Sequence, residues 1–121
     1  MKQIGWMMAA ALCAPGFGWA FDCAALDKTA NATGVQIAGS ASGQQVVGKG
    51  RLQFYSAPDE HCAMKGVFII PGDKVDGYTE SGGFTSVLYL NPKTHGEAQG
   101  WVKSTRLQPT GVGVAPSQPN P

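Results

Sequence analysis

The sequence has little charge and no block of charge of one sign. Its 121 residues include nine Lys and Arg side chains and eight Asp and Glu side chains, which gives a formal net charge of +1. A protein that binds nucleic acid or an acidic surface concentrates basic side chains on one face. The sequence therefore does not favour nucleic acid as a partner.

Long apolar runs are also missing, apart from one short run near the N-terminus. Ile4–Leu12 is largely apolar, Lys2 precedes it, and Pro15 follows before the run is long enough to span a membrane. Gly18-Trp19-Ala20 places small residues where a signal peptidase requires them. We interpret residues 1–20 as a secretory signal peptide. We expect a periplasmic or secreted protein, with no stable membrane insertion after cleavage; an uncleaved N-terminal anchor is the alternative.

Cysteine is scarce. The chain has three cysteines, and Cys13 lies within the expected signal peptide. The remaining pair, Cys23 and Cys62, predicts one disulfide in a small exported domain. Closing a loop of about 40 residues is worth roughly 4 kcal/mol in the chain-entropy model. The alternative role for Cys62 is a nucleophile activated by His61, but adjacent residues of an extended chain point to opposite faces.

Residues that carry catalysis or bind metals are few. The two histidines, His61 and His95, lie in predicted loops without a surrounding motif. Asp59, Glu60 and His61 are consecutive, so they cannot converge on one metal ion from an extended loop. The sequence contains neither a phosphate-binding glycine loop nor the serine motif of hydrolases. We therefore expect no enzymatic activity, no cofactor and no metal site.

Patterns with helical periodicity are almost absent, and 17 glycines are spread along the chain. This favours an all-β domain of short strands. Residues 21–45 are expected to form an N-terminal arm and loop, in which Phe21–Lys28 is a short turn of helix or an extended segment. Residues 46–108 are expected to form the β domain, and residues 109–121 a proline-rich disordered tail. The main expected strands are Arg51–Tyr55, Val67–Ile70, Lys74–Thr79, Phe84–Leu90 and Gly100–Ser104.

Four segments form an ordered set within the β domain. They are Arg51–Pro58, Ile70–Val75 with its Pro-Gly-Asp turn, Gly83–Val87, and Gly100–Ser104 followed by Leu107. In this order and spacing they resemble the bacterial SH3-like (SH3b) domain. The resemblance implies a small SH3-like five-stranded, partly open barrel, to which we expect the disulfide to tether the N-terminal arm. The position of Cys62 and the long loop Asn91–Gln99 depart from the family pattern and indicate a specialised relative.

Side-chain alternation along the expected strands assigns residues to two faces. One face carries the expected core residues Leu52, Phe54, Val75, Val87 and Val102. The opposite face carries Tyr55, Tyr78, Phe84 and Trp101. We expect these four rings to line one outer groove, because grouped aromatic side chains usually mark a binding surface. The alternative is that the rings cover the ends of a barrel with too few other apolar residues.

The resemblance and the groove imply an exported, non-enzymatic binding protein. It is expected to recognise a protein or a cell-wall ligand, such as a peptidoglycan fragment, in the bacterial periplasm. The alternative function is an immunity protein or an inhibitor of a periplasmic toxin or wall hydrolase. In that case the loops Pro58–Gly66 and Asn91–Gln99 are expected to form the contact surface, because protein inhibitors act through rigid loops.

Overall fold

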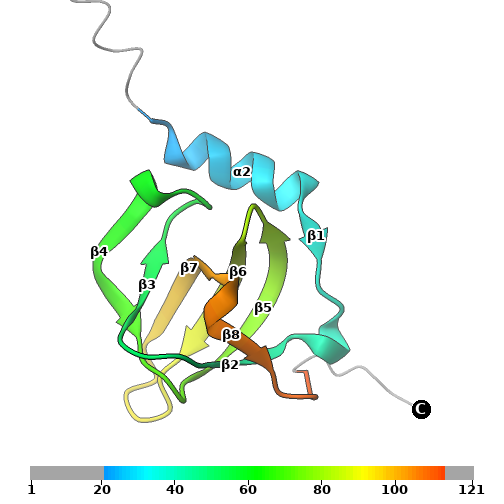
Figure 1. Cartoon of the computed structure of the whole chain (residues 1–121), viewed down its shortest axis with the longest axis vertical. Helices are drawn as coiled ribbons and strands as arrows, with labels where there is room; N and C mark the ends of the chain where they lie inside the picture. Colours follow the sequence, from blue (N-terminus) through cyan, green and yellow to red (C-terminus); the bar gives the residue numbers. More distant parts are fainter. Residues whose placement is uncertain (1–20, 114–121) are drawn as a thin grey trace, which may run out of the picture.

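The structure is a computed structural model that describes residues 21–113 (Figure 1). The expected signal peptide, residues 1–20, and most of the expected tail, residues 114–121, lie outside the described residues. The helix and strands, labelled as in Figure 1, are α2 Cys23–Thr33, β1 Val35–Gln36, β2 Gly43–Val46, β3 Leu52–Tyr55, β4 Ala63–Ile69, β5 Lys74–Ser81, β6 Phe84–Leu90, β7 Glu97–Lys103 and β8 Leu107–Pro109. Short 3-10 turns lie at Gly39–Ala41, Glu60–Cys62 and Ser104–Arg106.

The strands form one antiparallel sheet in the order β4-β3-β7-β6-β5-β2-β8, and β1 pairs with β5. Figure 1 shows that the sheet is curled. It is a half-barrel and not a closed barrel, because its end strands β4 and β8 do not pair with each other within residues 21–113. The predicted antiparallel β fold is confirmed. The sheet has eight strands where the sequence predicted five. Of the additional strands, β1 lies in the expected N-terminal arm, β2 spans the expected start of the β domain at residue 46, and β8 spans its expected end at residue 108.

The interior of the half-barrel is filled by apolar side chains from most of the strands. The buried residues of this core are Val46, Leu52, Phe54, Ile69, Val75, Val87 and Val102. They include all five residues that alternation assigned to the core. Side chains directly opposite one another in antiparallel strands share a face, and Thr85 and Val102 are such a pair. The alternation therefore identifies the inner and outer faces of β6 and β7.

Helix α2 begins after Asp22, whose carboxylate accepts a hydrogen bond from the backbone N–H of Ala25 at 2.9 Å. Such an N-cap typically stabilises a helix by about 1 kcal/mol. The sequence predicted a short turn of helix or an extended segment over Phe21–Lys28, and the observed helix is longer, with Ala30 as its one buried residue. Within residues 21–113, no helix has the length and apolar character needed to cross a membrane.

The predicted disulfide between Cys23 and Cys62 is confirmed, with a Cα–Cα distance of 5.8 Å. It joins the first residue of α2 to the 3-10 turn Glu60–Cys62 that follows β3. Figure 1 shows α2 lying across one end of the half-barrel. The first part of the expected N-terminal arm is therefore a helix whose first residue is bonded covalently to the turn between β3 and β4.

Strand β4 is an edge strand and is irregular in its middle. Its register against β3 shifts between Gln53 and Tyr55. The Gln53 side-chain amide donates hydrogen bonds to the backbone carbonyls of Met64 at 2.8 Å and Val67 at 3.1 Å. Gly66 lies between those two residues with a φ of 81°, a left-handed conformation that favours glycine. This part of β4 is therefore held by a side chain of β3.

The chain after β8 packs against β2. The backbone N–H of Gly43 donates to the Val112 carbonyl at 2.9 Å, and the N–H of Thr110 donates to the Gly43 carbonyl at 3.0 Å. A Cβ on Gly43 would clash with the Val112 carbonyl oxygen, so the close approach requires glycine. Ordered structure thus continues past residue 108, where the sequence predicted the start of a disordered tail.

Candidate functional site

The four aromatic residues that were expected to line a groove have different surroundings. Tyr55, Phe84 and Trp101 are buried together with Ala30 of α2, and Trp101 is only 1% exposed. The Tyr55 and Phe84 rings meet edge to face, with their centroids 5.1 Å apart. Tyr78 is 40% exposed and lies outside this cluster. The four rings therefore do not line one open groove.

Helix α2 is the reason why Tyr55, Phe84 and Trp101 are buried and do not line an open groove. Alternation placed Tyr55 and Trp101 on the face opposite the core, and the structure shows them as direct cross-strand partners. The helix covers that face, and Asp27 of α2 accepts a hydrogen bond from Trp101 Nε1 at 2.7 Å. The sequence held one signal of this contact, because Asp27 and Ala30 are three residues apart and share one side of a helix.

A cleft of about 360 Å³ remains between α2 and the sheet, and we call it the helix cleft. It is lined by Asp27, Asn31, Ser56, Met64, Ser86, Gln99, Gly100 and Trp101. These residues come from α2, β4, β6, β7 and the chain just after β3. Most of the lining side chains are polar. A site of this kind binds a ligand through a few convergent hydrogen-bonding groups.

Two polar groups define the chemistry of the helix cleft. Asp27 Oδ1 accepts hydrogen bonds from Trp101 Nε1 at 2.7 Å and Asn31 Nδ2 at 3.1 Å, whereas Asp27 Oδ2 has no hydrogen bond within the described residues. Ser86 is 7% exposed, and its hydroxyl has no partner among residues 21–113. Buried hydroxyl groups are normally hydrogen-bonded. The cleft therefore offers a ligand a hydroxyl and a carboxylate oxygen, neither of which is bonded to another group of the described residues.

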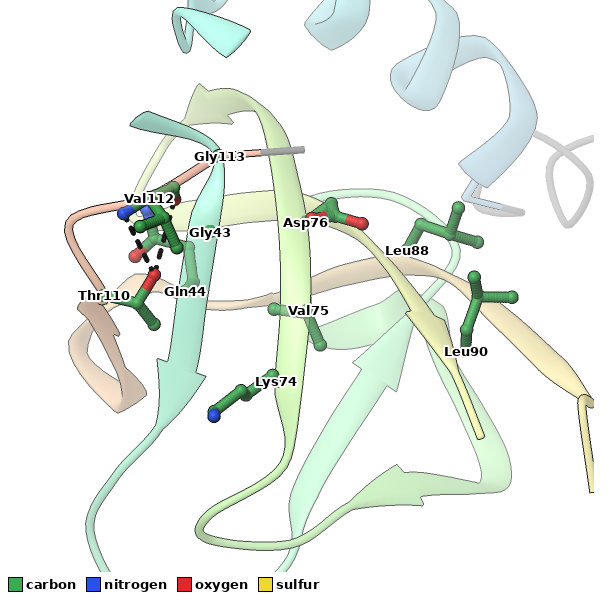
Figure 2. Close-up of a pocket in the computed structure, with 10 residues that line it drawn as sticks. All are labelled: Gly43, Gln44, Lys74, Val75, Asp76, Leu88, Leu90, Thr110, Val112 and Gly113. Atoms are coloured by element: carbon green, nitrogen blue, oxygen red, sulfur yellow. Dashed lines mark hydrogen bonds between the residues drawn. The ribbon is translucent and has the colours of Figure 1, made fainter. Parts of the chain in front are cut away.

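A second hollow, of about 220 Å³, lies over the outer side of β5, and we call it the β5 hollow. Figure 2 shows its lining residues, which are Gly43, Gln44, Lys74, Val75, Asp76, Leu88, Leu90, Thr110, Val112 and Gly113. Asp76 is paired across the sheet with Leu88 of β6 and with Gly43 of β2. Because cross-strand partners share a face, the Asp76 carboxylate and the Leu88 side chain project on the same side of the sheet.

Asp76 is the acidic group of the β5 hollow. Its carboxylate has no hydrogen bond or ion pair within the described residues, and burial raises its pKa above the usual value. Burial also raises the pKa of Tyr78, and the charge of Asp76 raises it further. In Figure 2 the side chain of Lys74 points away from Asp76. An unpaired acidic group therefore lies beside apolar side chains.

Charged side chains also surround the turn that carries the disulfide. Lys103 Nζ lies 2.6 Å from Glu60 Oε2, and this hydrogen bond is the main cause that lowers the pKa of Glu60 and raises that of Lys103. Burial, followed by the charge of Glu60, raises the pKa of Tyr55. Hydrogen bonds from the backbone N–H of His61, at 2.8 Å, and from its ring lower the pKa of Asp59. Of these contacts, the pair between Glu60 and Lys103 links the turn to β7, and the bonds between Asp59 and His61 lie within the turn.

Cys62 does not act as the nucleophile of the alternative interpretation in this fold, because its sulfur is bonded to Cys23. Within the part of the chain that the structure describes, no three His, Cys, Asp or Glu side chains are placed to hold a metal ion. The helix cleft and the β5 hollow are two of the hollows that residues 21–113 form, and both present polar groups to a ligand.

In comparisons with protein-family models, curated proteins and solved structures, nothing matches this chain.

Proposed function

We propose that this protein is an exported, non-enzymatic binding protein with an SH3-like domain, and that its helix cleft binds a polar cell-wall ligand such as a peptidoglycan fragment. The observation that carries the proposal is the buried Ser86 hydroxyl, which has no hydrogen-bond partner within the described residues. A hydroxyl that lines a cleft and is not engaged by another group of the described residues is available to donate or accept a hydrogen bond with a ligand.

The other polar groups of the helix cleft suit the amides and hydroxyls of a wall fragment. Asp27 Oδ2 accepts a hydrogen bond from an N–H or O–H group of a ligand. The side-chain amides of Asn31 and Gln99 supply both donors and acceptors. Sugars and short peptides present donors and acceptors close together, as this lining requires. The cleft therefore fits a short glycan or peptide better than an apolar molecule.

The expected site residues take modified roles in this proposal. Trp101 acts through its indole N–H, which holds Asp27 in the cleft, and not through an exposed ring face. Tyr55 and Phe84 support Trp101 from within the same buried cluster. Tyr78 does not line the cleft.

Two further features support export and the SH3-like interpretation. The disulfide between Cys23 and Cys62 is consistent with an oxidising compartment outside the cytoplasm. The antiparallel half-barrel is compatible with the partly open barrel that the resemblance implies.

Sedimentation with purified sacculi tests the proposal. We expect the oxidised protein to pellet with sacculi, and the variants Asp27→Asn and Ser86→Ala to bind about tenfold more weakly. Glu80→Gln removes an exposed carboxylate outside the cleft and is the matched control, with wild-type binding expected. Protein that stays in the supernatant, or cleft variants that pellet as well as the control, would overturn the assignment.

Preorganised loops favour one second candidate, an immunity protein or inhibitor of a periplasmic toxin or wall hydrolase. The loop after β6 is closed by hydrogen bonds from the N–H of Asn91 to the Gly96 carbonyl at 2.8 Å and from the N–H of His95 to the Asn91 carbonyl at 2.9 Å. The loop after β3 is fixed at Cys62 by the disulfide. Loops that are already ordered lose little entropy when they contact a protein partner.

An assay with lysozyme as the probe hydrolase separates the two functions. Sedimentation with sacculi and an unchanged rate of wall hydrolysis support the wall-binding function. Inhibition that is kept in Asp27→Asn but lost in Lys93→Glu, a change in the loop after β6, supports the inhibitor function. Lys93 is exposed, so its replacement is not expected to disturb the fold.

A further inference from the structure

The β5 hollow differs from the helix cleft in position and in chemistry. The two share no lining residue. The β5 hollow places the apolar side chains Leu88, Leu90 and Val112 around one carboxylate, that of Asp76. Leu90 is 52% exposed and Val112 is 66% exposed, although both are large apolar residues. Such a surface is suited to contact with another molecule.

The sheet and the C-terminal segment hold the Asp76 carboxylate in place. Asp76 is in the middle of three paired strands, opposite Leu88 on one side and Gly43 on the other. Figure 2 shows Thr110 and Val112 bonded to Gly43 at the β2 side of the hollow. These elements shield the carboxylate from water, and the shielding raises its pKa. A partly desolvated carboxylate gains free energy when a cation pairs with it.

No charged group of the described residues forms an ion pair with Asp76. Lys74 lines the hollow from the same strand but forms no ion pair with Asp76 in the described structure. Glu97 of β7 is the cross-strand partner of Leu90, so a second acid lies near the rim. Tyr78, two residues after Asp76, is uncharged below its raised pKa. Among these groups, Lys74 is the only competitor for the carboxylate.

We propose that the β5 hollow binds a primary ammonium group carried on a short apolar stem. The ammonium pairs with Asp76, and the stem lies against Leu88 and Leu90. The carboxylate matches the charge and the hydrogen-bond donors of an ammonium, while the leucines bury the methylenes of the stem. The lysine side chain of a partner protein and a free alkylamine share this chemistry.

A series of n-alkylammonium ions is the first probe, from methylammonium to butylammonium. Added to the purified, oxidised protein, these ions are expected to shift the amide resonances of Gly43, Asp76 and Leu88 in nuclear magnetic resonance spectra. Affinity should increase by about threefold for each added methylene, because each is buried against the leucines. n-Butanol has the stem without the charge and should bind about tenfold more weakly than butylammonium. Affinity that is independent of stem length, or butanol that binds as tightly, would overturn the proposal.

Substitutions of Asp76 and Lys74, the two charged residues that line the hollow, are expected to change the affinity for butylammonium in opposite directions. Asp76→Asn is nearly isosteric and should weaken butylammonium binding by about tenfold. Lys74→Ala removes the competing cation and should strengthen binding by about twofold. Glu80→Gln, outside the hollow, should leave the affinity unchanged. Unchanged affinity of Asp76→Asn for butylammonium would refute the site. If Asp76→Asn does not fold, weaker binding of butylammonium by Lys74→Ala would refute it.

Nα-acetyl-lysine N-methylamide distinguishes the two sources of the ammonium. Tighter binding than butylammonium assigns the hollow to a protein lysine, and weaker binding assigns it to a free alkylamine. Equal binding of the Nε-acetylated form, which has no charge, would exclude an ammonium site of either kind. None of these outcomes affects the helix-cleft proposal, because the two sites have no residue in common.

Discussion

Trp101 donates its indole N–H to the carboxylate of Asp27 at 2.7 Å, across 74 positions of sequence. This bond joins β7 to α2 at the edge of the buried cluster that contains Tyr55 and Phe84. A buried indole N–H needs an acceptor, because water cannot reach it. The helix therefore supplies both the cover and the polar partner for the outer face of β7.

Replacement of Asp27 by alanine is expected to destabilise the fold. The buried Trp101 N–H then loses its acceptor, which costs about 1–3 kcal/mol. Asp27→Asn keeps an acceptor oxygen and should cost less. Urea unfolding followed by circular dichroism measures both values, with Glu80→Ala as the control for loss of an exposed carboxylate. Equal unfolding midpoints for Asp27→Ala and the wild type would show that the bond does not stabilise the fold.

Loss of the disulfide is expected to reduce the free energy of unfolding by at least as much as Asp27→Ala does. The double variant Cys23→Ser, Cys62→Ser should lose about 2–5 kcal/mol, because the unfolded chain regains the freedom of a long open loop. Reduction of the wild type should lower the urea midpoint to that of the double variant. A midpoint that does not respond to reductant is the contrary result.

Gly100→Ala is expected to destabilise the sheet at the contact between β7 and β3. A Cβ at Gly100 would lie 2.8 Å from the carbonyl oxygen of Tyr55 and 3.1 Å from Cδ2 of Phe54. Both contacts are too close, and overpacking of this kind costs about 1–3 kcal/mol. Gly96→Ala is the matched control, since its Cβ would meet only Thr94 Oγ1 at 3.3 Å. Similar losses in the two variants would exclude steric crowding at β7 as the cause.

Asp76 gives a prediction for the pH dependence of stability. Burial raises its pKa in the folded protein above the unfolded value of about 3.9. The folded state therefore favours the protonated acid, and the contribution of Asp76 to stability falls as the pH rises from the unfolded pKa through the folded pKa. Asp76→Asn removes this loss.

The stability of Asp76→Asn relative to the wild type should therefore increase with pH. The free energy of unfolding of the variant minus that of the wild type should be smallest near about pH 3, where the wild-type carboxyl is protonated in the folded and the unfolded protein. Near about pH 7 the variant should be the more stable protein. Urea midpoints measured in parallel for both proteins give this difference and cancel the titration of the other groups. A difference that decreases over the same range would contradict the raised pKa.

Strands β3 to β7 of the half-barrel could be predicted from local patterns, and the disulfide could be predicted from the number of cysteines. Alternation in β5, β6 and β7 assigns Val75, Val87 and Val102 to the core without knowledge of the fold. Cys23 and Cys62 are the cysteines that remain after the expected signal peptide. These signals fix the class of fold but not what covers its outer face.

Helix α2 and both hollows could not be predicted in the same way. Ala30 is the one buried residue of the helix, so the sequence has no apolar stripe that would predict the length of the helix or its contact with the sheet. Ser86 becomes notable only because it lines a cleft together with Asp27 and Asn31 of α2. Thr110 and Val112 close the β5 hollow through backbone bonds to Gly43, which are tertiary contacts that composition does not reveal. The groove of four aromatic rings was expected because nothing local showed that a helix occupies that face.

The irregular middle of β4, where Gln53 bonds to the backbone, affects how readily this edge strand pairs with another copy of the protein. A regular edge strand pairs readily with a strand of another molecule and so starts aggregation. In β4 the carbonyls of Met64 and Val67 already accept hydrogen bonds from Gln53, Gly66 turns the backbone between them, and Lys65 adds an exposed charge. The outermost strand β4 is therefore irregular in its middle and carries a charge, and both features make an edge strand a poorer template for a second chain.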